Sequence, residues 1–144
     1  MTATPPAKPT EAGIDLDQVR TTGDAAAWLR QEAARHAAAA TTESSPTHAR
    51  ALGLTGGTLE AYVAVLGTHR DPASIGAELG RLADDYRHPD RDIVEPVPED
   101  HRLACGRLAD TLGPLAQQLA RIAATQRHRT SHPAWPATGR YIDL

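Results

Sequence analysis

The stretch Cys105-Gly-Arg-Leu-Ala-Asp-Thr-Leu-Gly-Pro-Leu-Ala-Gln-Gln-Leu-Ala-Arg-Ile122 decides the fold of this chain. Its large apolar residues follow one another at intervals of three and four, which places them on one side of an α-helix. Because the register continues across Pro114, we expect a kinked but continuous helix. The residues on this side are Cys105, Leu108, Leu112, Leu115, Leu119 and Ile122.

Two further helices are indicated by their capping signals. One is predicted over 24–41, where Thr22-Gly23-Asp24 offers an N-cap and Trp28 is expected to anchor the core. The other is predicted over 72–87, because Asp71 is a good N-cap and Pro72 suits the first helical position. Both helices have one apolar side, so both are expected to pack against a neighbour.

The segment between these two helices is less regular. Pro46 favours a short helical segment that reaches Leu52, and Gly53, Gly56 and Gly57 are expected to end it. Residues 59–66 then have helical spacing but also suit a strand. The absence of partner strands in the sequence favours a helix there.

The sequence therefore predicts an all-α fold, an irregular small bundle of about four main helices over residues 14–130. Residues 1–13 and 131–144 are predicted to be disordered tails, since they are rich in proline and lack apolar periodicity. The stretch from Arg87 to Pro98 contains several prolines and acids and is predicted to be an extended connector.

Composition narrows the function classes. A net charge of −3 argues against a dedicated nucleic-acid binder, which would carry a basic domain. No apolar run is long enough to cross a membrane, and the N-terminal residues lack the pattern of a secretion signal. Together with a single cysteine, Cys105, these features predict a cytoplasmic protein. Alanine supplies much of the apolar content, so we expect a thin core.

The pair Arg127 and His132 is the candidate catalytic site. The stretch Arg127-His-Arg-Thr-Ser-His132 resembles the signature of HEPN-type ribonucleases, in which an arginine and a polar residue precede a histidine. HEPN domains are all-α, and the resemblance, which covers six residues, implies metal-independent RNA cleavage. A guanidinium can hold a phosphate while a histidine moves the proton of the attacking 2′-hydroxyl.

Metal and cofactor sites are not predicted. His128 and His132 have the four-residue spacing of two ligands on one helical face. Pro133 follows directly, however, and disfavours a helical conformation at His132. The acids between Asp84 and Asp100 are interleaved with arginines, and the sequence contains no phosphate-binding loop or dinucleotide fingerprint.

We therefore expect a small interaction or accessory protein that acts through helix–helix contacts. Its partner is expected to be a protein, either a different one or a second copy of the same chain. The homodimer would use the face formed by Leu108, Leu112, Leu115 and Leu119. The alternative function is the HEPN-like ribonuclease with Arg127 and His132.

Overall fold

A computed structural model of the chain describes residues 13–67, 71–91 and 95–131. It contains a short 3-10 turn η1 (Leu16–Gln18) and the α-helices α2 (Thr22–Thr42), α3 (Pro46–Gly67), α4 (Pro72–Arg87) and α5 (Glu99–Ser131). The described residues contain no strand, which confirms the all-α prediction. The predicted tails lie outside the described residues, except for Gly13 and for Ser131, the last residue of α5.

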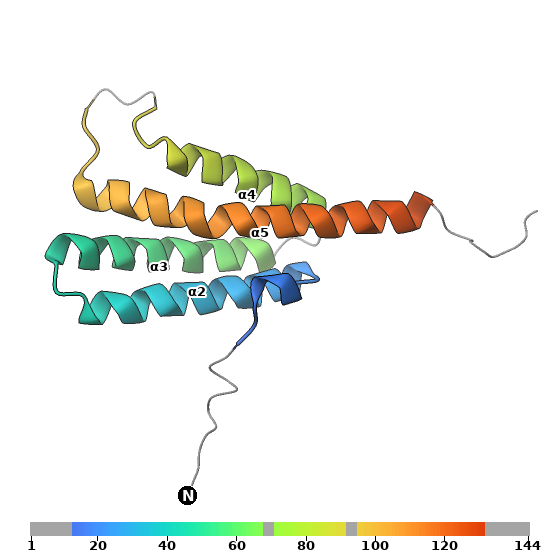
Figure 1. Ribbon diagram of the computed structural model, residues 1–144, viewed down its shortest axis with the longest axis horizontal. Coiled ribbons are helices and arrows are strands. Elements are labelled where there is room, and N and C mark those ends of the chain that lie inside the picture. The colour runs from blue at the N-terminus through green and yellow to red at the C-terminus, as the bar shows by residue number, and fades with distance from the viewer. Residues whose placement is uncertain (1–12, 68–70, 92–94, 132–144) are drawn as a thin grey trace, which may run out of the picture.

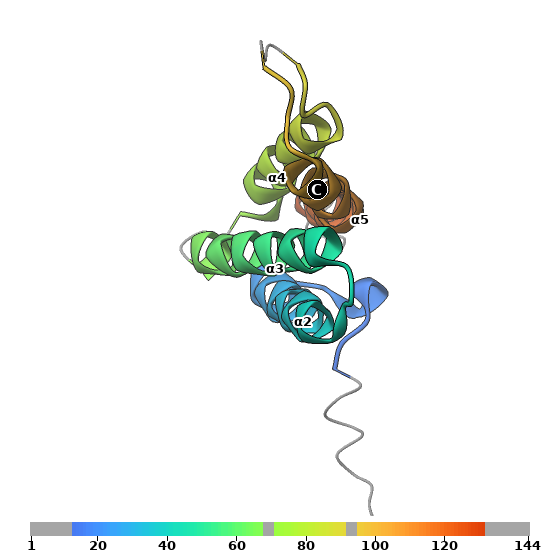
Figure 2. The same ribbon diagram turned by 90° about the vertical axis from the view of Figure 1, so that its left-hand side faces the viewer.

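The helices form two antiparallel hairpins (Figure 1). One pairs α2 with α3, the other pairs α4 with α5, and the hairpins meet mainly where α3 lies against α5. Seen from one end, α4 and α5 lie above α3, and α2 lies below it (Figure 2). The segment with η1 lies on the side of α2 and α5. Gln31 holds it there, since its amide bonds to the N–H and the C=O of Ile14, both at 2.9 Å.

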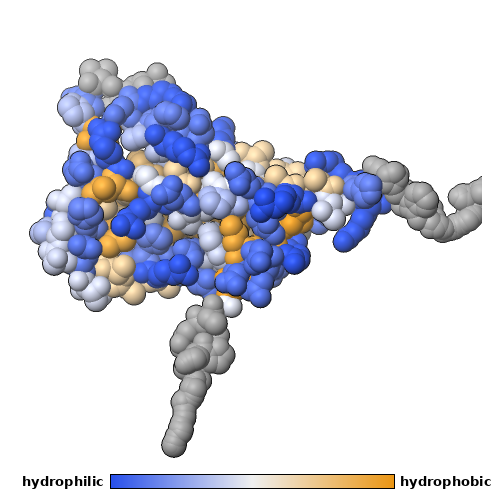
Figure 3. Space-filling model, in the orientation of Figure 1, coloured by the Kyte–Doolittle hydropathy of each residue, from blue (hydrophilic) through white to orange (hydrophobic). Residues whose placement is uncertain are grey.

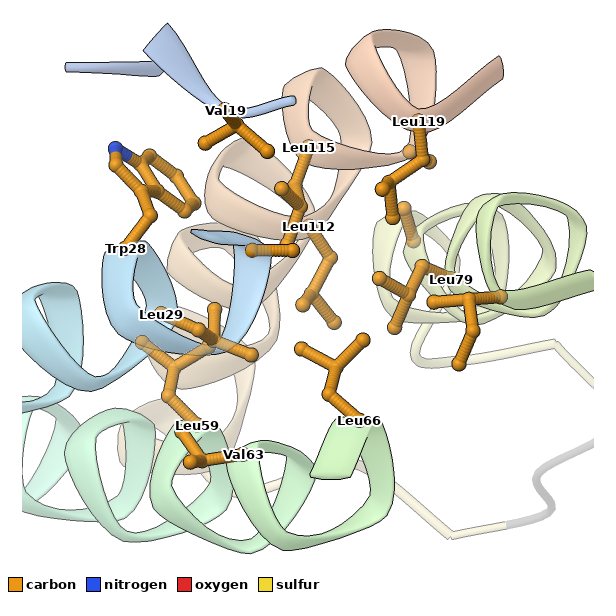
Figure 4. Close-up of a cluster of buried hydrophobic side chains, with 14 of the residues drawn as sticks. Val19, Trp28, Leu29, Leu59, Val63, Leu66, Leu79, Leu112, Leu115 and Leu119 are labelled. Atoms are coloured by element: carbon orange, nitrogen blue, oxygen red, sulfur yellow. The ribbon is translucent and has the colours of Figure 1, made fainter. Parts of the chain in front are cut away.

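The hydrophobic core lies where the two hairpins meet (Figure 4). The leucine seam of α5 is its centre: Leu112, Leu115 and Leu119 have no exposed surface. Trp28 of α2 is buried beside them, as its spacing predicted. The other large core residues come from the segment after η1 and from all four helices: Val19, Leu29, Leu59, Val63, Leu66, Ile75, Leu79 and Leu108.

The helix starts follow the capping rules, with one shift. Asp71 caps α4 by accepting the N–H of Ala73, and Pro72 occupies the first turn, as predicted. The start predicted for α2 is wrong by two residues, because Thr21 is the N-cap and its hydroxyl accepts the N–H of Asp24 at 3.0 Å. Thr21, Thr22 and Asp24 are all residue types that suit an N-cap, and each would accept the N–H of a residue two or three positions after itself, so cap preference alone does not fix the first residue of α2.

The break predicted at Gly53, Gly56 and Gly57 is wrong, because α3 is one helix from Pro46 to Gly67 and includes residues 59–66. Gly56 has a packing reason to be glycine. A Cβ atom there would lie 3.1 Å from the carbonyl oxygen of Ala33 and 3.3 Å from the backbone nitrogen of Ala37, so the glycine lets α2 and α3 approach closely. The prediction treated as helix ends residues that serve a helix–helix contact.

A second glycine sets the contact between α4 and α5. A Cβ atom at Gly76 would lie 3.2 Å from that of Leu119 and 3.3 Å from the carbonyl oxygen of Ala116. The helix α5 itself runs through Pro114 without interruption, which confirms the predicted continuity. The buried register departs from the prediction at its ends: Ala104 is buried, whereas Cys105 and Ile122 are only half-buried.

Candidate functional site

The candidate site is the outward side of α3, which carries apolar and small residues where a surface helix normally carries polar ones. Leu54 is 40% exposed and Val65 is 46% exposed, and they are the exposed large hydrophobic residues of the described chain. Small exposed residues at helical spacing lie between them. We call the set of Gly53, Leu54, Gly57, Ala61, Ala64 and Val65 the α3 face.

Two glycines of the α3 face have no packing role among the residues that the structure describes. A Cβ atom at Gly53 or at Gly57 would meet no other atom within 4 Å, in contrast to Gly56 on the inner side of the same helix. Glycine within a helix costs about 1 kcal/mol relative to alanine. Their positions on the apolar side of the helix leave the backbone open to close approach by another helix.

The α3 face continues into an apolar groove between α3 and α4. Tyr62, Val65 and Leu66 form one wall, and Ile75, Leu79 and Leu82 of α4 face them across the groove, with Ser74 and Glu78 as polar lining residues. On the opposite side of the bundle, the corresponding gap between α2 and α5 is covered by the segment with η1, whose Val19 is fully buried. The described chain covers only one of its two inter-hairpin gaps.

A tyrosine pair ties α3 to α4 beside the groove. The hydroxyl oxygens of Tyr62 and Tyr86 lie 2.7 Å apart, within hydrogen-bonding distance. Burial, followed by this hydrogen bond, raises the pKa of Tyr86 above its ordinary value, so the phenol stays neutral. The pair fixes the spacing of the two helices and offers no acid–base chemistry near neutral pH.

Charged and polar residues border the Gly53 end of the α3 face, where Arg50, Asp100 and His101 line a hollow together with Gly53, Leu54 and Gly57. Glu60 is the one charged residue in the sequence between Arg50 and Gly67. The guanidinium of Arg50 is engaged by Asp100 of α5, with its Nε 3.2 Å from a carboxylate oxygen. The hydrogen bond to Arg50 contributes to lowering the pKa of Asp100, which therefore stays ionised. The face thus favours apolar contact over ionic recognition.

The leucine face predicted to form the dimer lies inside the bundle. Leu108, Leu112, Leu115 and Leu119 are at most 4% exposed and pack against the other helices of the same chain. A second copy could not reach them unless the hairpins separated. Any contact between folded copies must therefore use another surface, and the sequence did not indicate α3 because its glycines were interpreted as a break.

The ribonuclease pair is not brought together by the described residues. Arg127 lies on the exposed surface near the end of α5, where it has contacts with other residues. His132 lies outside the described residues, so the HEPN-like site stays a prediction. The arrangement of His128 and His132 as two metal ligands also depends on His132, so the structure does not describe it. Among the described residues, no three His, Cys, Asp or Glu side chains gather in a way that could hold a metal ion.

The thiol of Cys105, the single cysteine of the sequence, is not activated. Cys105 lies half-buried beside His101 in a shallow hollow, and the carboxylate of Asp100 lies toward Arg50 instead. Burial raises the pKa of the Cys105 thiol, and the nearby charge of Arg102 opposes this effect only in part. A raised pKa reduces the thiolate fraction at neutral pH, so this thiol is a poor nucleophile.

Comparisons of the chain with protein-family models, with curated proteins and with solved structures find no match. None of the described helices is long and apolar enough to span a bilayer. The cytoplasmic location inferred from composition stays a prediction.

Proposed function

We propose that this chain is a small interaction module that associates through helix–helix contacts on the α3 face, and that the occupant of this face is a second copy of the chain. The observation that carries the proposal is the pairing of exposed Leu54 and Val65 with two glycines, Gly53 and Gly57, that have open space around them. Exposed apolar surface and helix-weakening glycines both cost stability in the monomer. A helix packed against them would offset both costs.

The order of residues along the α3 face supports a second copy as the occupant. Leu54 and Val65, the two large residues of the face, lie toward its ends, and the small residues Gly57 and Ala61 lie in the middle. This order is nearly symmetrical about residue 59. In an antiparallel pair of α3 helices related by a two-fold axis, Leu54 of one copy would lie against the Ala64–Val65 end of the other, and Gly57 would oppose Ala61.

Charge restricts this arrangement at one residue. A two-fold contact brings each charged side chain close to the same side chain of the second copy, so a self-associating face must carry few charges. Glu60 is exposed one residue from the symmetry centre and would lie near Glu60 of the second copy, whereas Arg50 is already paired with Asp100. The apolar groove beside Val65 extends the contact toward α4, which adds area to an interface that one helix alone would leave small.

Sedimentation equilibrium tests the proposal. The wild-type chain is expected to show a reversible monomer–dimer equilibrium at micromolar concentrations. The substitution Ala61→Glu places a carboxylate at the centre of the proposed contact, and two such charges across the two-fold axis should shift the equilibrium to monomer. Ala61 is exposed in the monomer, so helical circular dichroism should be retained.

The matched control is Ala34→Glu, which makes the same change at an exposed alanine on α2. This variant is expected to sediment as the wild type does. A wild-type chain that stays monomeric at all concentrations up to about 0.5 mM, far above the micromolar range expected for the dimer, would refute the proposal. So would a dimer that both glutamate variants weaken equally.

A further inference from the structure

Another hollow lies where the segment that follows η1 meets the C-terminal half of α5; Figure 3 shows hydrophilic residues with apolar ones among them on this side of the molecule. Arg20 comes from the N-terminal segment, and Arg121 and Arg129 come from α5. The other lining residues, Gln118, Ile122, Thr125 and Gln126, are uncharged. Three guanidinium groups therefore line one hollow that contains no acidic lining residue.

One of these guanidinium groups is held by a buried amide. Arg121 donates from Nε and Nη2 to the side-chain oxygen of Gln118, at 3.2 and 2.7 Å. Gln118 is only 7% exposed, and its own Nε2 donates to the carbonyl oxygen of Val19 at 2.8 Å. This chain of hydrogen bonds fixes Arg121 over the hollow without neutralising its charge.

The second guanidinium group is likewise held by neutral acceptors. Nη1 of Arg20 donates to the carbonyl oxygen of Asp17, and it lies 3.4 Å from that of Val19. The carboxylate of Asp24, at the start of α2, accepts the backbone N–H of Arg20 at 2.9 Å instead of its guanidinium. The charge of Arg20 is therefore positioned but not paired.

Several other arginines of the surface are paired. Arg81, Arg91 and Arg102 each lie within 4.0 Å of an aspartate oxygen. Within the described ranges, no carboxylate oxygen lies that close to the guanidinium of Arg20, Arg121 or Arg129. Arg30, Arg87 and Arg107, which are exposed elsewhere, also have no carboxylate that close among the described residues, so the hollow is distinguished by the meeting of several such arginines in one place. The helix dipole accounts for a cation in the last turn of α5, but Arg121 lies almost three turns before that end and Arg20 lies on another element.

We propose that this hollow binds the phosphate group of a small phosphorylated ligand. Arginine suits this chemistry because its planar N–H groups match phosphate oxygens in pairs and stay charged at all physiological pH values. Thr125 and Gln126 complete the lining, and the Thr125 hydroxyl donates to the carbonyl oxygen of Arg121 at 3.0 Å. The site lies on η1 and α5, away from the α3 face, so it is independent of the proposed association.

Isothermal titration calorimetry with inorganic pyrophosphate, at about 0.15 M ionic strength and pH 7.5, tests this site. The wild-type chain is expected to bind one equivalent saturably. Arg121→Gln removes the charge that Gln118 positions, and the affinity should fall about tenfold, the effect of losing one charge-assisted interaction. Arg121→Lys keeps the charge but loses the paired N–H groups, so its affinity for pyrophosphate should lie between those of the wild type and of Arg121→Gln.

Arg107→Gln is the matched control, because Arg107 is an exposed arginine on α5 about 21 Å along the axis from Arg121, well beyond the screening length at physiological salt. Its affinity for pyrophosphate should equal that of the wild type. An equal loss in the Arg107→Gln and Arg121→Gln variants would show a general charge effect and overturn the proposal. Failure of the wild-type chain to bind saturably up to about 10 mM would overturn it as well.

Discussion

Two adjacent glycines of α3 should respond with opposite signs to the same substitution. Gly57 lies on the open α3 face, where an added Cβ atom meets nothing within 4 Å. Gly57→Ala should therefore stabilise the monomer by about 0.5 to 1 kcal/mol, because alanine loses less backbone entropy in a helix. Gly53→Ala should behave in the same way, since its surroundings are equally open.

Gly56→Ala should instead be neutral or destabilising. Its Cβ atom would lie 3.1 and 3.3 Å from backbone atoms of Ala33 and Ala37, which cannot rotate away as a side chain can. The helix α2 would have to shift by a few tenths of an ångström, and overpacking of this kind costs about 1 to 3 kcal/mol. After the helix-propensity gain is subtracted, a net loss of about 0 to 2 kcal/mol remains.

Urea unfolding followed by circular dichroism, at protein concentrations low enough to keep the chain monomeric, measures this difference. We expect the Gly57→Ala variant to be more stable than the Gly56→Ala variant by about 1 to 3 kcal/mol. Equal stabilisation of both variants would show that α2 and α3 do not approach closely at Gly56. Destabilisation by Gly57→Ala would show that the α3 face is not open in the monomer.

Three further predictions concern the core and the thiol. Leu115→Asp should abolish helical circular dichroism at every protein concentration, because the carboxylate would replace a fully buried leucine; a folded variant would contradict the core assignment. Trp28→Ala should cost about 3 to 5 kcal/mol in urea unfolding, and a loss below about 1 kcal/mol would show that Trp28 is not an anchor. Iodoacetamide should alkylate Cys105 at pH 8 more slowly than it alkylates free cysteine, because burial raises the thiol pKa; a faster reaction would contradict this.

The sequence predicted the elements whose signals are local. Asp71 with Pro72 gave the start of α4, and the spacing from Leu108 to Leu119 gave the buried side of α5. Both depend on interactions within one helix or on its period, which a linear sequence contains. The continuity of α5 across Pro114 could be predicted for the same reason, since the apolar register does not shift there.

The errors concern contacts between helices. Gly56 was expected to end a helix, but its role depends on the backbone of α2, which is close only in the folded chain. The leucine side of α5 suited both the bundle core and a dimer face, because a sequence does not show which apolar surface the chain itself covers; in the structure it is buried within the chain. The basic hollow could be predicted only in part: Arg121 and Arg129 lie in the C-terminal part of α5, where the helix dipole already favours cations, and Arg20 is far from them in the sequence.

Disulfide cross-linking reports directly on contact between α3 helices of two copies. In a Cys105→Ala background, the double variant Leu54→Cys/Val65→Cys places thiols at both ends of the α3 face. The two sites are about 16 Å apart along one helix, too far for a disulfide within a chain. In the antiparallel pair, the thiol at position 54 of each copy lies near the thiol at position 65 of the other copy. Mild oxidation should therefore give a covalent dimer on a non-reducing gel.

The control is Ala27→Cys/Ala38→Cys in the same background, with the same separation on exposed positions of α2. We predict rapid covalent dimerisation of the α3 double variant, little of the α2 double variant, and little of the Leu54→Cys variant alone. Equal, slow cross-linking of the α2 and α3 double variants would contradict association through α3. Dimerisation of the Leu54→Cys variant alone, as fast as that of the double variant, would contradict the antiparallel arrangement.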